Sequence, residues 1–132
     1  MRQIVRLVSL AVFAAVLLAA LPSLASADRA AIRSERIQLR EAVTRSKLVP
    51  RPIRAGDFTL RRARISTEGR WAISTIAPTG AARRTLDAVA GMFRHARGRW
   101  TLVEVGTAGV GCAKLIVPRD VRRDLGIVCA VA

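Results

Sequence analysis

An apolar run near the start of the chain most limits its fold, because it predicts that part of the chain is removed. Arg2 and Arg6 precede the run 7–21, Pro22 ends it, and Ala25-Ser26-Ala27 has the small-x-small pattern of a signal peptidase site. The run is shorter than the roughly 20 residues that a membrane-spanning helix needs. It also lacks the arginine pair of twin-arginine signals and the cysteine of lipoproteins. We therefore predict a Sec-type signal peptide over 1–27, cleavage after Ala27, and a secreted or extracytoplasmic mature chain without a transmembrane segment.

Removal of the signal peptide leaves residues 28–132, the length of a single domain. Of the hydrophobic residues, 20 lie in the first 27, and 48 remain among the other 105. That fraction is ordinary for a globular domain and supports a modest core. The only cysteines are Cys112 and Cys129. An even number in an oxidising compartment predicts one disulfide, and a reactive thiol is the alternative.

The first part of the mature chain predicts a helix followed by a linker. Ile32, Leu39 and Val43 fall on one helical stripe within the charged segment 28–47, which contains no glycine or proline. Pro50 and Pro52 oppose helical angles in the residues before them. We therefore expect a helix over 28–47 and a linker over 48–57.

Residues 58–106 predict a four-stranded antiparallel meander made of two similar hairpins. Strands are expected over 58–66, 70–77, 88–95 and 99–105, with glycine-containing turns at Gly69 and Gly98. Gly-Arg-Trp occurs at 69–71 and again at 98–100, each time where the second strand of a hairpin begins. The segment 86–93 also fits a helical stripe, and we choose a strand because the Gly98 turn requires a partner. The two tryptophans are interpreted as core residues in preference to a stacking platform for a ligand.

Residues 107–132 predict a loop, a short helix and the disulfide. Pro118 suits the first helical turn, Asp120 suits the positive helix start, and Gly126 suits the end. The helix then carries Cys129 back to Cys112. The expected fold class is therefore α+β: an N-terminal helix, an antiparallel sheet, and a short C-terminal helix clipped by a disulfide.

The mature chain is strongly basic. The formal charge of the whole chain is +14, and it falls to +12 once Arg2 and Arg6 are removed. Such a charge attracts polyanions, whereas a preference for arginine with little lysine also results from GC-rich codons. Both interpretations stay open. The candidate anion-binding residues are Arg51, Arg54, Arg61, Arg62 and Arg64.

On a regular strand Arg62 and Arg64 share one face and Arg61 points to the other. A solvated basic edge that prevents strand association is an equal alternative for these arginines. The chain has no tyrosine and few aromatic residues, so base stacking is poorly supported and specific nucleic-acid binding is not expected.

No motif predicts catalysis, a cofactor or a metal. The glycine-rich segment 106–114 has Cys112 and Ala113 where a phosphate-binding loop needs lysine and a hydroxyl. His95 is the only histidine, and a Cys–His pair needs a sulfur that the expected disulfide uses. Asp120 and Asp124 have arginines beside them and suit a solvated helix face. We therefore name no catalytic, cofactor-binding or metal-binding residue and expect a protein that is not an enzyme.

The C-terminal half resembles small exported proteins of unknown function from high-GC Gram-positive bacteria. The similarity is carried by the patterns at 98–100, 106–112, 117–118 and 125–129. It supports the Cys112–Cys129 bridge and implies no activity and no functional residue.

The leading functional expectation is an exported, non-enzymatic binding or accessory protein whose basic face associates with anionic wall polymers or lipid headgroups. The alternative is a protein-directed module, such as an extracellular inhibitor that presents the loop 106–111 to a protein partner. A small hydrolase is the least favoured interpretation.

Overall fold

The computed structural model describes residues 28–50, 53–112 and 117–130. The predicted signal peptide and Arg51 lie outside these ranges. In chain order the elements are β1 (Arg29–Ala30), α1 (Arg33–Arg45), the 3₁₀ helix η1 (Ala55–Asp57), β2 (Phe58–Ile65), β3 (Trp71–Pro78), the 3₁₀ helix η2 (Gly80–Arg84), β4 (Val89–Ala96), β5 (Arg99–Gly106) and α2 (Arg119–Asp124). The α+β class is confirmed.

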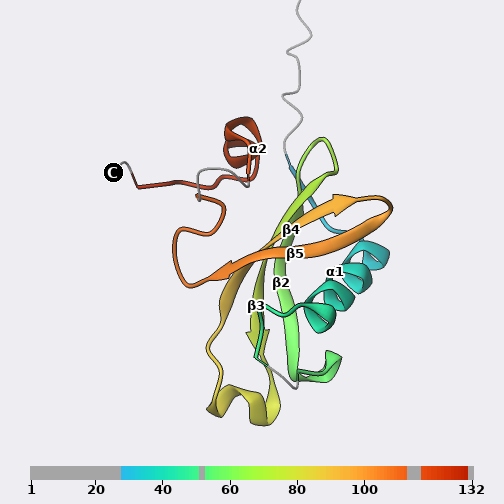
Figure 1. The fold of residues 1–132 in the computed structure, drawn as a ribbon, viewed down its shortest axis with the longest axis vertical. Helices are drawn as coiled ribbons and strands as arrows, with labels where there is room; N and C mark the ends of the chain where they lie inside the picture. The colour runs from blue at the N-terminus through green and yellow to red at the C-terminus, as the bar shows by residue number, and fades with distance from the viewer. Residues whose placement is uncertain (1–27, 51–52, 113–116, 131–132) are drawn as a thin grey trace, which may run out of the picture.

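The strands form one antiparallel sheet in the order β1-β2-β3-β4-β5 (Figure 1). The meander of two hairpins is therefore correct, but the predicted number of four strands is wrong. The fifth strand is β1, in which Arg29 pairs with Ile65 and Ala30 with Arg64. A strand of two residues is too short to show an alternating pattern in the sequence, so only its pairing with β2 identifies it.

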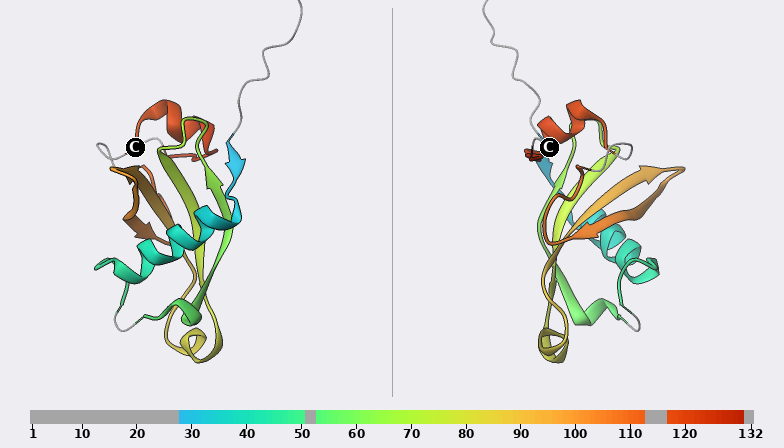
Figure 2. Two further views of the ribbon diagram at one scale, coloured as in Figure 1. Left: turned by 90° about the vertical axis from the view of Figure 1, so that its right-hand side faces the viewer. Right: turned by 60° about the vertical axis from the view of Figure 1, so that its left-hand side comes forward.

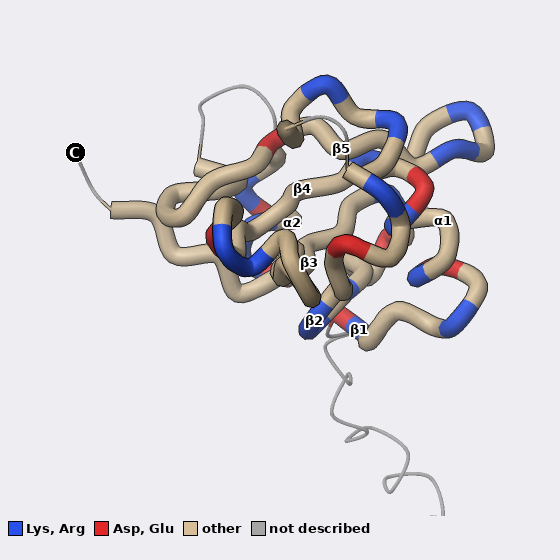
Figure 3. Tube along the Cα trace, turned by 90° about the horizontal axis from the view of Figure 1, so that it is seen from below, with Lys and Arg blue, Asp and Glu red and all other residues tan. Residues whose placement is uncertain are grey.

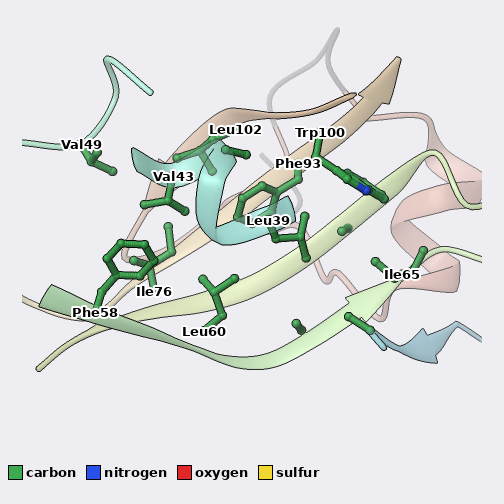
Figure 4. Packing of buried hydrophobic residues seen from close by; sticks show 14 residues of the cluster. Leu39, Val43, Val49, Phe58, Leu60, Ile65, Ile76, Phe93, Trp100 and Leu102 are labelled. Carbon is green, nitrogen blue, oxygen red and sulfur yellow. The ribbon is translucent and has the colours of Figure 1, made fainter. Parts of the chain in front are cut away.

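Helix α1 covers one face of the sheet (Figure 2, left). It begins at Arg33, later than predicted, because the residues before it pair with β2. At its start the Glu35 carboxylate accepts the backbone N–H of Ile32 at 3.0 Å, an interaction that satisfies an otherwise unbonded helix donor. Leu39 and Val43 are fully buried among side chains of β2 to β5 (Figure 4).

The opposite face of the sheet carries a second, smaller core built by the C-terminal segment. Its buried residues are Trp71, Met92, Val110, Val117, Val121 and Leu125. Trp100 belongs to the core under α1, so the two tryptophans lie in separate clusters. Both are buried, as predicted, with 6% of Trp71 and 4% of Trp100 exposed. The repeat therefore marks two equivalent strand starts and gives no shared stacking platform.

Strand β2 contains a bulge that changes which arginines share a face. Arg61 pairs with Thr75, whereas the next pair is Arg64 with Ile73, so the extra residue interrupts the alternation. Arg62 occupies the bulge with φ 51°. Arg61 and Arg64 consequently share the face opposite α1, and the sequence-based pairing of Arg62 with Arg64 is wrong.

Ile32, predicted on the helical stripe with Leu39 and Val43, precedes α1 and is exposed. The predictions for the β4 segment, the Gly98 turn, Gly126 and the disulfide agree with the structure. Residues 89–93 of the ambiguous segment belong to β4. The β4–β5 turn consists of Arg97 and Gly98, both with positive φ, the geometry of a two-residue hairpin turn. Gly126 follows α2 with φ 68°, and Cys112 is bonded to Cys129. The predicted disulfide is confirmed.

Candidate anion-binding site

A basic hollow of about 620 Å³ lies between the two hairpin turns and the start of α2. The β4–β5 hairpin bends toward the side on which α1 lies, which separates its tip from the β2–β3 turn (Figure 2, right). The lining residues are Glu68, Arg70, Trp71, Arg94, His95, Ala96, Arg97 and Pro118. We call this the turn hollow.

Arg94 is placed in the turn hollow by strand pairing. It stands opposite Trp71 in the β3–β4 register, and its guanidinium carbon is 5.7 Å from the centroid of the Trp71 ring. Such a cation–π contact stabilises by about 0.5–1 kcal/mol at exposed sites and orients the cation. The buried Trp71 ring therefore lies beneath the Arg94 guanidinium.

Arg70 and Arg97 reach the turn hollow from the two turns. The backbone carbonyl of Arg70 accepts the N–H of His95 at 2.7 Å, which fixes the position of the residue before β3. Among the residues that the structure describes, the side chains of Arg70 and Arg97 have no hydrogen-bond or ion-pair partner. Three arginines and one acidic residue, Glu68, therefore line a single hollow. The planar guanidinium fork suits the oxygens of phosphate or carboxylate.

The turn hollow offers guanidinium groups, one carboxylate and one imidazole. Its described lining contains no hydroxyl or thiol that an acid–base group could activate. The imidazole of His95 packs on the Trp100 ring with a centroid distance of 4.9 Å. Both sulfurs are in the disulfide. The described residues also hold no cluster of three or more His, Cys, Asp or Glu suited to a metal ion.

The four described arginines among those singled out from the sequence lie at different places along η1 and β2. Arg54 precedes η1, where its backbone N–H binds the Asp57 carboxylate at 2.7 Å. Arg61 and Arg62 lie at the bulge of β2, and Arg64 forms an ion pair with Asp28. The steps from Phe58 to Ile65 span roughly 23 Å at the usual strand rise, so Arg54 and Arg64 are at opposite ends of β2.

The acidic residues neutralise few of the arginines. The described ranges hold 19 lysines and arginines and 9 acidic residues. Only three acids, Asp28, Glu35 and Glu41, form ion pairs there. Three others bind backbone N–H groups: Asp57 binds Arg54, Glu104 binds Gly111, and Asp124 binds Thr67. In Figure 3 the basic segments accordingly appear at the top, the right and the bottom of the outline and on α2, whereas the left side near the C-terminus is tan.

The loop 106–111 is held firmly but offers little to a protein partner. Val110 is buried against Gly106, and the Glu104 carboxylate accepts the N–H of Gly111 at 2.9 Å. The exposed residues between them are Thr107, Ala108 and Gly109. Small side chains of this kind lack the aromatic or arginine anchors that dominate binding energy at protein interfaces.

Sequence reasoning missed the turn hollow. Arg70 is the middle residue of the first Gly-Arg-Trp repeat, so that repeat was the one sequence feature that could have pointed to the hollow. The register that sets Arg94 opposite Trp71, and the bend of the β4–β5 hairpin that opens the hollow beside Arg97, are not visible in the sequence.

Comparison with protein-family models, curated proteins and solved structures finds no match to this chain. None of the helices within 28–50, 53–112 and 117–130 has the length and apolar character required to span a membrane.

Proposed function

We propose that the protein is an exported, non-enzymatic binding protein that associates with phosphate-bearing anionic components of the cell envelope. The observation that carries this proposal is the turn hollow, whose lining includes Arg70, Arg94 and Arg97 and a single acidic residue, Glu68. The excess of arginine over acid elsewhere adds a long-range attraction that raises the rate of encounter with a polyanion. The hollow then supplies the place where individual phosphates bind.

The test compares two variants with the same net charge. In the first, Arg70, Arg94 and Arg97 are all replaced by glutamine. In the second, three exposed arginines outside the hollow, Arg33, Arg84 and Arg123, are replaced instead. The ligands are poly(glycerol phosphate) in solution and vesicles of phosphatidylcholine with or without phosphatidylglycerol, which separate a wall polymer from a lipid headgroup.

Affinity is measured for both ligands at low and high salt. We expect binding to weaken steeply as ionic strength rises above about 0.1 M. The hollow variant should lose about tenfold or more in affinity beyond the loss in the control. Equal losses in the two variants would show that overall charge, and not the hollow, binds the polyanion. Retention that does not change with salt would overturn the ionic proposal itself.

A further inference from the structure

An apolar pocket opens at the end of the sheet opposite to α2, where η1 and η2 lie (Figure 1). Its volume is about 300 Å³, at the lower limit of the pockets that hold small organic ligands. Most of its described lining is apolar, and it includes Leu48, Phe58, Ile76, Leu86 and Asp87. We call this the end pocket.

Strand pairing and the linker build the walls of the end pocket. Phe58 pairs with Pro78 at the ends of β2 and β3, and the N–H of Thr79 donates to the Asp57 carbonyl at 2.8 Å. On the side of the linker, Val49 is 7% exposed and belongs to the core under α1. The walls are therefore held by backbone bonds and by core packing, and the pocket exists without a ligand.

The end pocket is an opening into the main core. Phe58 and Ile76 are 1% and 3% exposed and form its inner part, whereas Leu48 is 48% exposed. Val89 and Val105 are partly buried and pack against the same core. An apolar group that enters the pocket removes this surface from water, which favours binding.

The charge of the end pocket is opposite to that of the other hollows. Its described lining contains two carboxylates, Asp57 and Asp87, and neither lysine nor arginine. By contrast, the turn hollow and two hollows beside α1 each include arginine. Arg83 donates to the Pro78 carbonyl at 3.2 Å, but it is not part of the described lining.

Both carboxylates have oxygens that a ligand can use. Within the described ranges no side chain or N–H bonds Asp87, and Asp57 uses only Oδ2, which accepts the N–H of Arg54 at 2.7 Å. A protonated amine donates up to three hydrogen bonds and has the complementary charge. Salt screens charges farther away than about 10 Å at 0.1 M, so the two carboxylates act on a bound amine more strongly than arginines elsewhere on the surface.

We propose that the end pocket binds an amphiphilic amine. The apolar tail contacts Phe58 and Ile76, and the ammonium group lies beside the carboxylates of Asp57 and Asp87. This site is separate from the turn hollow, so it stands whether or not the hollow binds phosphate.

The first test compares three ligands that share one tail and differ in charge. Octylammonium, octanol and octanoate are titrated into the exported protein at neutral pH in a calorimeter. We expect octylammonium to bind about threefold or more tighter than octanol, and octanoate to bind more weakly than octanol, because only the ammonium group is attracted by the carboxylates. Equal affinities, tighter binding of octanoate, or no binding of octylammonium would overturn the proposal.

Tail length and methyl signals locate the ligand. Butylammonium should bind more than tenfold more weakly than octylammonium, because each buried methylene adds to affinity. The methyl signals of Leu48, Leu86 and Val105 should shift in the NMR spectrum on titration, whereas those of Val121 and Leu125 should not. Equal binding of the two amines, or shifts confined to the second pair, contradicts the proposal. Shifts of the first set with protein concentration alone would assign the pocket to a second copy and also overturn it.

A matched pair of variants tests the role of the carboxylate. Asp87→Asn should weaken octylammonium by about threefold and leave octanol unchanged, since octanol needs only the apolar walls. Unchanged octanol binding also shows that the variant keeps the pocket. Asp120→Asn makes the same change in net charge at an exposed position of α2 and should leave both affinities unchanged. Equal losses of octylammonium in the two variants would show that only total charge matters, which contradicts a site at Asp87.

Discussion

Replacing Cys112 and Cys129 by serine should lower the free energy of unfolding by about 3 kcal/mol. The magnitude follows from the sequence separation of 17 between the two cysteines. A cross-link of that span removes about 10 cal/mol/K of loop entropy from the unfolded chain, equal to about 3 kcal/mol at room temperature on the chain-entropy account. The variant should still fold, since small domains commonly have 5–15 kcal/mol in total.

The loop that the disulfide closes contains α2, whose side chains shield Trp71. Val121 and Leu125 are each 3% exposed and pack in the same cluster as that tryptophan. These contacts do not depend on the sulfurs, so we expect the cluster to survive in the serine variant. Trp71 and Trp100 lie in separate clusters, and each can therefore report on its own side of the sheet.

The assay is urea unfolding monitored by tryptophan fluorescence, in a Trp100→Phe background and separately in a Trp71→Phe background. We expect the midpoint to fall by roughly 1–3 M urea when the cysteines are replaced, with the two reporters changing together. A loss below about 1 kcal/mol would refute the loop-entropy reasoning. An earlier change at Trp71 than at Trp100 would show that the C-terminal layer detaches before the sheet unfolds.

Three further changes test particular contacts. Gly91→Ala places a Cβ 2.8 Å from the buried Cδ1 of Ile76, and overpacking of this kind should lower stability in thermal unfolding by about 1–3 kcal/mol. Arg36→Ala removes the bond to a carbonyl at the β2 edge and should cost about 1–2 kcal/mol in urea unfolding. The Arg29 guanidinium holds the pKa of Glu35 below its usual range. Glu35→Gln should therefore destabilise most at neutral pH, and the difference from wild type in urea unfolding should shrink as the pH falls below about 4.

The parts of the fold that sequence reasoning found are those specified by local signals. The Gly69 and Gly98 turns need positive φ, and the structure places both glycines there. The short helix between Pro118 and Gly126 is likewise marked by the residues at its start and end. The disulfide followed from two cysteines and an expected oxidising compartment. None of these predictions needed knowledge of which strands are neighbours.

The parts that sequence reasoning missed depend on pairing between distant residues. β1 exists only because Arg29 and Ala30 lie beside β2. The bulge at Arg62 reverses the face assignment of the residues after it, and nothing in the alternation of β2 marks the extra residue. The turn hollow likewise requires the register between β3 and β4. A strand's faces can be predicted only where its hydrophobic alternation is regular.

The arrangement of the acids bears on whether the high arginine content is merely compositional. A codon bias changes the number of arginines, but it does not direct the few carboxylates to backbone N–H groups and leave Arg70 and Arg97 without partners among the described residues. Replacing Arg70, Arg94 and Arg97 by lysine separates the two interpretations, because charge is kept and the planar fork is lost. If the charge alone matters, binding of poly(glycerol phosphate) will be unchanged. If the hollow is a phosphate site, affinity should fall by about threefold or more, since lysine cannot form bidentate bonds or lie flat on the Trp71 ring.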